Sequence, residues 1–354
     1  MFDECERPVI LLGQGVRLAG ADPASLMELG VPVLTSWLAK DCVDNFHQMY
    51  FGSPGIYGQR MANKVLAAAD VVLAIGNRLS IWNAGYTGLR PDQRLVMVDV
   101  DAEEVALFPQ ADWIRQDAKA FIEDMPLIGV YPSWQEQCAA WREQYPLIES
   151  AHADQDGYIN SYRFMAELQK HLKPDSIIVT DAGGACCSAW QTLMLKPPQR
   201  MMTSGGLGEM GCGLPAVIGA AFASGKEVIC IVGDGAMMLN LQELATIAHH
   251  QLPVKIIVFA NDGYGMIKRS QQVMGLPEVA VGRKTGLSFP DWYKMPSAFG
   301  LLQCNRLDEL FYDMQPAMLV VHLHPDQQFI PKLNPIMVDG KPTTPAFDQM
   351  SPLL

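Results

Sequence analysis

Two short polar motifs each follow an apolar run of the chain, and this arrangement constrains the fold more than any other feature. Gly233-Asp234-Gly235 follows the run 227–232, and Asn261-Asp262-Gly263 follows the run 253–260. Between them, apolar residues recur every three or four positions over 236–251, which predicts a helix. A strand, a helix and a second strand form a βαβ unit with parallel strands. Both motifs are therefore expected at one edge of a parallel sheet that is covered on both faces.

The residue types at these strand ends suit a phosphate group bound through magnesium. Ligands of open parallel sheets bind beyond the carboxyl ends of the strands. The Asp234 carboxylate, the Asn261 amide oxygen and a backbone carbonyl are hard ligands for Mg²⁺, which keeps its other positions for water and phosphate oxygens. A lone Gly-Asp-Gly indicates an ordinary turn. Its place between two strands, with the partner motif 261–265, instead predicts a Mg²⁺-diphosphate site.

The two motifs and the helix between them resemble the thiamine diphosphate signature of acetohydroxyacid synthases, pyruvate decarboxylases and benzoylformate decarboxylases. The segment 204–220 extends this resemblance, because it is similar to the acetohydroxyacid synthase segment that holds the aminopyrimidine ring. The resemblance implies an enzyme that uses thiamine diphosphate and Mg²⁺. It covers two of the three α/β domains of a complete member.

The resemblance implies roles for individual residues at the charged end of the cofactor. Mg²⁺ would be bound by the side chains of Asp234 and Asn261 and by the carbonyl oxygen of Gly263. The diphosphate would accept hydrogen bonds from the backbone N–H groups of Gly235 and Ala236, at the start of a helix.

At the other end of the cofactor, Met210 would lie beneath the bent molecule. Backbone groups of Gly208 and Met210 would bond the pyrimidine edge. In relatives, a loop that precedes this segment reaches the diphosphate, often with glutamine and histidine side chains. Here the positions that match those side chains are Gly184 and Ala185, so only backbone donors are expected, and Gly183 and Gly184 are the candidate diphosphate contacts.

The helix that follows the second motif is expected beside the reacting carbon of the cofactor. Tyr264 and Met266 are therefore candidate cofactor or substrate contacts, and Lys268 is a candidate substrate contact. The alternative is that Met266 packs the helix and Lys268 is solvated.

A dinucleotide site is a rival interpretation of the glycine-rich segment. Residues 206–211 satisfy the pattern Gly-x-Gly-x-x-Gly, and Asp234 follows at a distance not far from that of a ribose-binding acid. However, residues 199–204 make a poor buried strand, and a dinucleotide site gives Asn261 no role. The thiamine diphosphate interpretation is therefore preferred.

The first part of the chain predicts a second α/β domain. Apolar strands are expected at 8–12, 31–35, 71–75 and 95–100, with helices between them. Here the sequence resembles the central domain of the acetohydroxyacid synthase group, in the segments 69–80 and 94–104.

Some members of that group bind FAD or another adenine nucleotide in the central domain. Gly13, Gly15 and Arg78 would be the relevant positions. The alternative is that the two glycines only turn a strand into a helix, because the third glycine of the pattern is missing. FAD is allowed by the resemblance but is not predicted.

The expected fold class is α/β, with two doubly wound parallel-sheet domains, as a length of 354 residues also suggests. The predicted division is a central α/β domain at 1–128, a linker helix within 129–157, a diphosphate- and Mg²⁺-binding α/β domain at 158–335, and a C-terminal tail at 336–354.

Composition and charge exclude several classes of partner. A net charge of −12 argues against nucleic acid and against anionic membrane surfaces. We find neither a targeting segment nor an apolar run of about 18 residues, the length that a membrane helix needs. A cytoplasmic protein is therefore expected.

The resemblance also indicates what this chain lacks. In a complete relative, the first domain carries the glutamate that activates the aminopyrimidine, and no such domain precedes Pro8. Glu209 lies in the segment expected on the opposite pyrimidine edge, so it is a poor substitute. We expect the activating glutamate on a separate pyrimidine-domain subunit, within a homo- or hetero-oligomer. A truncated piece of a longer chain would have the same sequence.

The resemblance implies a reaction of a small 2-oxo acid. The leading expectation is decarboxylation followed by carboligation, as in acetolactate synthase. The alternatives are a simple 2-oxo acid decarboxylase, and a regulatory or structural subunit that retains the fold without catalysis.

Overall fold

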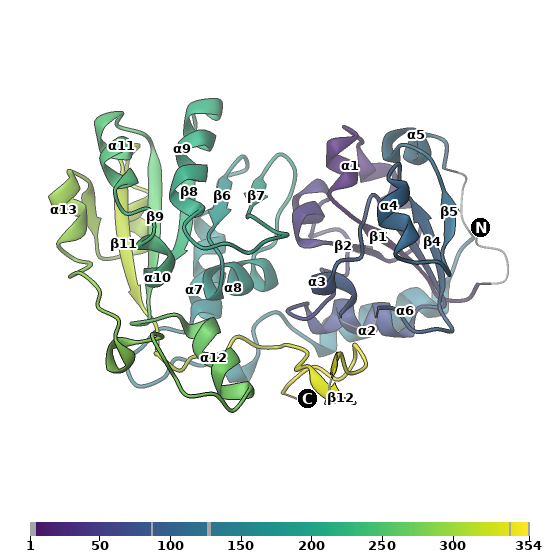
Figure 1. The fold of residues 1–354 in the computed structure, drawn as a ribbon. Helices are drawn as coiled ribbons and strands as arrows, with labels where there is room; N and C mark the ends of the chain where they lie inside the picture. Colours follow the sequence, from purple (N-terminus) through teal and green to yellow (C-terminus); the bar gives the residue numbers. More distant parts are fainter. Residues whose placement is uncertain (1–4, 86–87, 126–128, 340, 353–354) are drawn as a thin grey trace. The chain divides into compact units, whose positions relative to one another are not determined.

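The computed structural model describes residues 5–85, 88–125, 129–339 and 341–352, which form two compact units (Figure 1). Unit 1 comprises Met1–Leu147, Met194–Pro197 and Ile330–Leu354, and unit 2 comprises Ile148–Leu193 and Pro198–Phe329. Part of the predicted linker region and the whole predicted tail thus belong to unit 1. The outermost residues of the predicted first domain, 1–4 and 126–128, and parts of the tail lie outside the described residues.

Unit 1 is built on a parallel sheet with the strand order β2-β1-β3-β4-β5. Its strands are β1 (Pro8–Leu12), β2 (Val33–Thr35), β3 (Val71–Ile75), β4 (Arg94–Val98) and β5 (Asp112–Ile114). Its helices are α1 (Gly15–Leu18), η1 (Pro23–Glu28), η2 (Trp37–Cys42), α2 (Arg60–Ala68), α3 (Ile81–Ala84), α4 (Ala102–Ala106), α5 (Ala118–Glu123) and α6 (Pro132–Gln144).

Both faces of this sheet are covered, as the alternation of side chains along a strand requires. In β1, Val9 and Leu11 join a core with α2 and α6, whereas Ile10 and Leu12 join a core with η1 and α5. The helix predicted between the domains is therefore α6, and it packs within unit 1 through Trp134.

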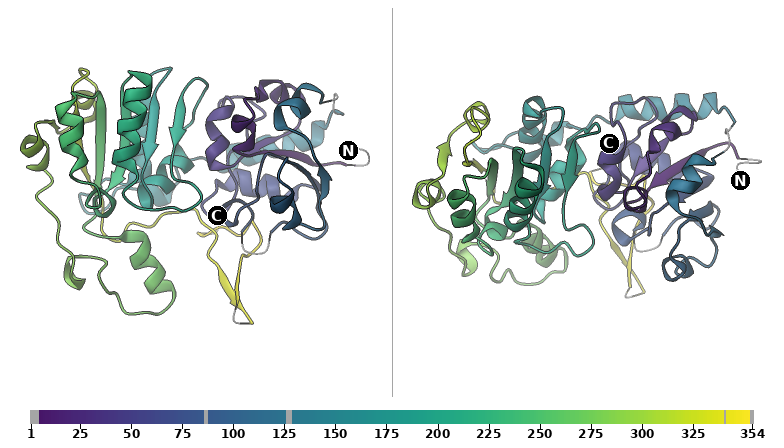
Figure 2. Two further views of the ribbon diagram at one scale, coloured as in Figure 1. Left: turned by 45° about the horizontal axis from the view of Figure 1, so that its top comes forward. Right: turned by 90° about the horizontal axis from the view of Figure 1, so that it is seen from above.

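The C-terminal segment contributes to the same unit. Leu333, Phe347 and Met350 are buried in the core that contains α2 and α6. The segment also forms an antiparallel hairpin of β12 (Ile336–Val338) and β13 (Lys341–Thr343), drawn in yellow in Figure 2.

Unit 2 is built on a larger parallel sheet with the strand order β10-β11-β9-β8-β6-β7. Its strands are β6 (Ile177–Thr180), β7 (Arg200–Met202), β8 (Val228–Gly233), β9 (Val254–Ala260), β10 (Leu302–Cys304) and β11 (Ala317–His322). Its helices are η3 (Ser150–His152), α7 (Ser161–Leu168), η4 (Gln169–His171), α8 (Gly184–Thr192), α9 (Gly213–Ser224), α10 (Asp234–Met237), α11 (Glu243–His249), α12 (Gly265–Val273), η5 (Arg283–Thr285), α13 (Met295–Phe299) and α14 (Leu307–Leu310).

Helices also cover both faces of the second sheet. Val228, Cys230 and Val232 of β8 pack with α9 and α11. On the opposite face, Phe164 of α7 meets Phe259 of β9 edge-on, with ring centroids 5.6 Å apart. Two doubly wound parallel sheets confirm the predicted fold class.

The helix predicted over 236–251 is interrupted. It consists of α10 and α11, with residues 238–242 between them outside any helix. Asn240 explains the break, because its side-chain Nδ2 donates a hydrogen bond to the Gly211 carbonyl, 2.7 Å away. An asparagine that bonds to the backbone of another segment favours a turn over a continuous helix.

Lys40 in η2 and Lys255 in β9 have no exposed surface. The Lys255 ammonium donates to the carbonyl groups of Asp313 and Gln315, at 2.7 and 2.6 Å. Burial lowers the pKa of Lys40 to about 7. A helix long and apolar enough to cross a membrane is not found in the part of the chain that the structure describes.

Candidate functional site

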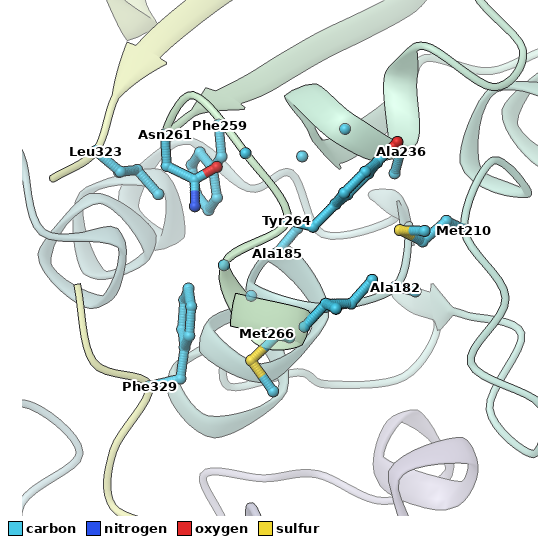
Figure 3. A pocket seen from close by; sticks show the side chains of 17 residues that line it. Ala182, Ala185, Met210, Ala236, Phe259, Asn261, Tyr264, Met266, Leu323 and Phe329 are labelled. Carbon is cyan, nitrogen blue, oxygen red and sulfur yellow. The ribbon is translucent and has the colours of Figure 1, made fainter. Parts of the chain in front are cut away.

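A pocket lies at the carboxyl ends of β6, β8 and β9 (Figure 3). The chain passes from β6 to the edge strand β7 and then to β8 on the other side of β6. The ends of β6 and β8 therefore flank the point where the strand order reverses, which is where open α/β sheets bind ligands.

Asp234 lies at the floor of this site with no exposed surface. Its Oδ1 accepts a hydrogen bond from its neighbour Gly235 N at 2.7 Å. Its Oδ2 accepts from Asn261 N at 3.0 Å and from Asp262 N at 2.7 Å. Burial raises the pKa of the Asp234 carboxyl to about 7, even though these N–H groups stabilise its charged form. A cation beside Asp234 would favour the charged carboxylate.

Asn261 brings a second side chain to Asp234. One terminal atom of its amide group lies 3.1 Å from Asp234 Oδ1 and 2.9 Å from the Gly263 carbonyl oxygen. With the amide nitrogen at that position, both oxygens accept a hydrogen bond. A cation bound beside these groups would instead face the amide oxygen, together with the oxygens of Asp234 and Gly263. Such a cluster of hard oxygen ligands suits Mg²⁺.

Two glycines of the motifs are required by close packing. A Cβ atom on Gly235 would lie 2.3 Å from Cε1 of Tyr264, because the tyrosine ring covers this position. A Cβ atom on Gly263 would lie 2.1 Å from the Val281 carbonyl oxygen. Both contacts fix the backbone beside Asp234, so the glycines position the site as well as allowing close approach to a ligand.

The predicted contacts of the diphosphate loop lie at the start of α8. Gly183 has φ = +80°, and Gly184 begins the helix. A Cβ atom on Gly184 would lie 2.0 Å from Cζ of Phe329, which fills the space beside it. Only the backbone of these two residues can therefore contact a ligand, as the sequence indicated.

The structure brings most of the predicted residues to this pocket. Its lining includes Gly183, Gly184, Met210, Gly235, Ala236, Asn261, Gly263, Tyr264 and Met266. In Figure 3, Asn261 lies on one side of the pocket and Met210 on the other, with Tyr264 between them. Asp234 lies behind this lining through its contacts with Asn261 and Gly235.

Two other predicted residues lie elsewhere. Gly208 has φ = +63° and is not among the lining residues, although its neighbour Met210 is. Lys268 forms an ion pair with Asp326 and lines a second, polar pocket on the far side of the loop at 261–265.

Sequence reasoning missed several residues of the site. Phe259, Leu323 and Phe329 give the pocket an apolar side. Asp181 was also missed, although its buried carboxylate accepts hydrogen bonds from Gly211 N at 3.1 Å and Gly213 N at 2.7 Å. Asp181 therefore holds the glycine-rich segment of Met210 beside the end of β6. The available signal was its place directly after a strand.

The candidate nucleotide positions of unit 1 contact other parts of the protein. Gly13 N donates to Ile75 O at 2.9 Å, and Gly15 N donates to Gly76 O at 3.0 Å. A Cβ atom on Gly15 would lie 2.6 Å from the Gly76 Cα. Arg78 pairs with Glu104 at 3.5 Å. The glycines thus pack two loops together, which agrees with the turn interpretation.

The residues of the pocket in unit 2 fit a magnesium-bound diphosphate. Asp234, Asn261 and Gly263 bring a carboxylate, a side-chain amide and a backbone carbonyl together, and α8 and α10 begin among the lining residues. The apolar side chains nearby suit an organic ring. Among the described residues that line this pocket, none is acidic.

Comparison with known proteins agrees with this geometry. Residues 181–321 match the thiamine pyrophosphate enzyme C-terminal TPP binding domain, and residues 1–125 match the thiamine pyrophosphate enzyme central domain. Together these matches account for most of the chain.

Curated relatives are large subunits of acetolactate synthase. Isozyme 1 from Escherichia coli K12 is 29% identical over 95% of this chain and 62% of its own length. The probable acetolactate synthase large subunit from Methanocaldococcus jannaschii is 30% identical, over 99% of this chain and 64% of its own length. Acetolactate synthase isozyme 2 large subunit from E. coli K12 is 30% identical over 85% of this chain and 55% of its own length. The chain thus spans less than two thirds of these relatives. It belongs to the thiamine pyrophosphate enzyme family, in the acetolactate synthase-like group.

Proposed function

We propose that this chain supplies the diphosphate half of a thiamine diphosphate- and Mg²⁺-dependent enzyme. The observation that carries the proposal is the juxtaposition of the Asp234 carboxylate, the Asn261 side-chain amide and the Gly263 carbonyl beside helix N-termini at the β6–β8 edge. The proposed reaction is decarboxylation of a small 2-oxo acid with carboligation of the product to a second carbonyl compound, because the relatives are acetolactate synthases.

The residues of the chain bind and orient the cofactor. Asp234 and Asn261 hold Mg²⁺ through side-chain oxygens, and Gly263 through its carbonyl. At the start of α10, the backbone N–H group of Ala236 would donate to the diphosphate, and that of Gly235, which donates to Asp234 Oδ1 in this structure, would have to turn toward it. Bound thiamine diphosphate supplies the carbon nucleophile that attacks the 2-oxo acid and the ring that accepts electrons as CO₂ leaves.

The side chains beside the organic part of the cofactor provide support and exclude water. Met210 is the apolar support beneath the cofactor, and Met266 with Phe329 forms an apolar wall on the lower side of Figure 3. An apolar wall removes water from the reacting centre, which strengthens electrostatic interactions there.

The activating acid is proposed to come from a separate pyrimidine-domain subunit, because the described lining of the pocket has no acid. A surface for such a subunit adjoins the pocket. Leu207 is 88% exposed in the segment that carries Met210, and Leu239, which contacts Gly211, is 49% exposed. Large apolar side chains exposed together indicate an interaction surface.

The first test is a calorimetric titration of the purified chain with magnesium diphosphate and with thiamine diphosphate. Because the chain is proposed to hold the diphosphate half of the site, we expect it to bind magnesium diphosphate without a partner chain. When EDTA removes Mg²⁺, we expect no binding of diphosphate. Asp234→Asn should abolish this binding, whereas Asp308→Asn, at an exposed position of unit 2, should leave it unchanged.

The second test adds a candidate pyrimidine-domain protein and measures CO₂ release from pyruvate. Turnover only with both chains present would support the split enzyme. CO₂ release that yields a free aldehyde, with no ligation product, would support the simple decarboxylase instead. Cofactor binding without turnover of any 2-oxo acid would favour a non-catalytic subunit, and the absence of magnesium diphosphate binding by a folded sample would refute the cofactor assignment.

A further inference from the structure

The loop that carries the proposed metal ligands, called here the metal loop (residues 261–263), is held from outside by the segment that follows α12. Tyr264 N donates to Val281 O at 3.0 Å, and Gly263 forms an antiparallel bridge with Gly282. The backbones are so close that a Cβ atom on Gly263 would lie 2.1 Å from the Val281 carbonyl oxygen. The segment 281–283 therefore restrains the backbone of a proposed ligand directly.

Asp262 is the central residue of the metal loop, and it forms hydrogen bonds with Asp234 and with Arg283. Its backbone N–H donates to Asp234 Oδ2 at 2.7 Å. Its own carboxylate faces outward, where Oδ1 accepts a hydrogen bond from Arg283 Nε at 2.9 Å. The contacts thus form a continuous path from Arg283 through Asp262 to Asp234.

The conformation of Asp262 needs such support. Its φ is +57°, in the left-handed region that residues other than glycine adopt at a cost of about 1 to 2 kcal/mol. Asn261 and Gly263, on either side of it, carry two of the three oxygens proposed to bind Mg²⁺. Any rotation of the backbone at Asp262 would therefore separate these oxygens.

Arg283 is well placed to hold Asp262. Its guanidinium carbon lies 5.8 Å from the ring centroid of Phe289, which orients the side chain by a cation–π contact. Arg283 lines the second pocket, with Lys268 and Asp326, and does not line the pocket that contains Met210. It therefore reaches the metal loop from this second pocket, which shares Asn261 and Gly263 with the first.

We propose that Arg283 is a positioning residue for the Mg²⁺ site, which it supports through Asp262. This inference rests on the proposed function, since it concerns the same cofactor site. Residues that orient metal ligands typically change metal affinity by about 10- to 100-fold when removed. The Arg283–Asp262 pair is about half exposed on both sides, at 52% each, so solvent weakens it and we expect an effect of about 3- to 10-fold.

The experiment measures magnesium-dependent binding of inorganic diphosphate by the full chain. A first titration varies the Mg²⁺ concentration at a fixed diphosphate concentration, and a second varies the diphosphate concentration at saturating Mg²⁺. Arg283→Gln should raise the apparent Kd for Mg²⁺ by about 3- to 10-fold, leaving the affinity for diphosphate at saturating Mg²⁺ unchanged. Arg283→Lys should recover part of the loss, because it keeps the charge. The matched control is Arg306→Gln, which breaks a surface pair with Asp308 in the same unit.

A double-mutant cycle tests whether Arg283 acts through Asp262. Asp262→Asn keeps a residue that tolerates positive φ and removes the acceptor charge. We expect Arg283→Gln to have no further effect on Mg²⁺ affinity in the Asp262→Asn background. Unchanged melting temperatures would show that unit 2 remains folded.

Three results would overturn the inference. An unchanged Mg²⁺ affinity in Arg283→Gln would show that Arg283 does not support the Mg²⁺ site. Additive effects of the two substitutions would show that Arg283 acts independently of Asp262. A lower diphosphate affinity at saturating Mg²⁺ would indicate direct contact with the ligand. If the wild-type chain binds no magnesium diphosphate, the proposed function fails as well, and this outcome is separate from the other three.

Discussion

The buried lysine of unit 1 gives a quantitative prediction about stability that is independent of any cofactor. Lys40 has no exposed surface, and burial lowers its pKa from 10.5 to about 7. Between these values the unfolded chain binds a proton that the folded chain has lost, so the contribution of Lys40 to stability rises with pH. Lys40→Met removes this dependence and keeps an apolar side chain of similar length.

The size of the effect follows from the pKa change of 10.5 − 7 = 3.5. At about 1.36 kcal/mol per unit, burying the charged lysine costs about 5 kcal/mol at pH 6. At pH 9 the folded lysine is neutral, whereas most unfolded chains are still charged, and the cost falls to about 2 kcal/mol. The stability gained by Lys40→Met should therefore be about 3 kcal/mol larger at pH 6 than at pH 9.

Urea denaturation of Lys40→Met and wild type at pH 6, 7, 8 and 9 measures this difference. Any change in packing at the substituted site is independent of pH, so it cancels when the stability differences at two pH values are compared. Lys119→Met, which removes an exposed lysine of the same unit, is the matched control and should show no such trend. A difference between Lys40→Met and wild type that stays constant from pH 6 to pH 9 would refute the argument that burial sets the protonation of Lys40.

Other predictions concern unit 2. Lys255→Met should destabilise the protein by about 1 to 3 kcal/mol in urea denaturation, because two partly buried carbonyl groups lose their donor; wild-type stability would contradict this. Gly263→Ala should weaken magnesium diphosphate binding by at least about tenfold in calorimetry, because the new methyl group displaces the backbone from Val281. Gly235→Ala should lower stability by about 1 to 3 kcal/mol by overpacking against Tyr264, and adding Tyr264→Ala should relieve that clash; independent effects in the double variant would refute the contact.

The sequence allowed accurate prediction where local patterns decide the structure. The apolar runs before Asp234 and Asn261 had to be buried parallel strands, and parallel strands end at one edge. Their juxtaposition followed from that pairing alone. Gly184 was identified differently, through the resemblance of its loop to the diphosphate loop of relatives, as a position that offers only backbone groups.

Long-range contacts could not be predicted in this way. Asp181 holds backbone groups 30 and 32 positions further along the chain, and no periodic pattern marks such a pair. Phe329 fills the space beside Gly184 only because the chain returns there after completing the sheet. The interruption between α10 and α11 likewise depends on Asn240 reaching Gly211.

The discontinuous composition of unit 1 has a consequence for synthesis on the ribosome. Its core needs Leu333, which emerges 333 − 147 = 186 residues after the first continuous part of the unit is complete. At about 5 to 20 residues per second, that interval lasts roughly 10 to 40 seconds. Unit 2 is nearly continuous and can close its core during this time. The unit that is translated first is therefore completed last. Until the C-terminal segment has been made, the apolar surface that it covers in unit 1 stays exposed and can bind chaperones or aggregate.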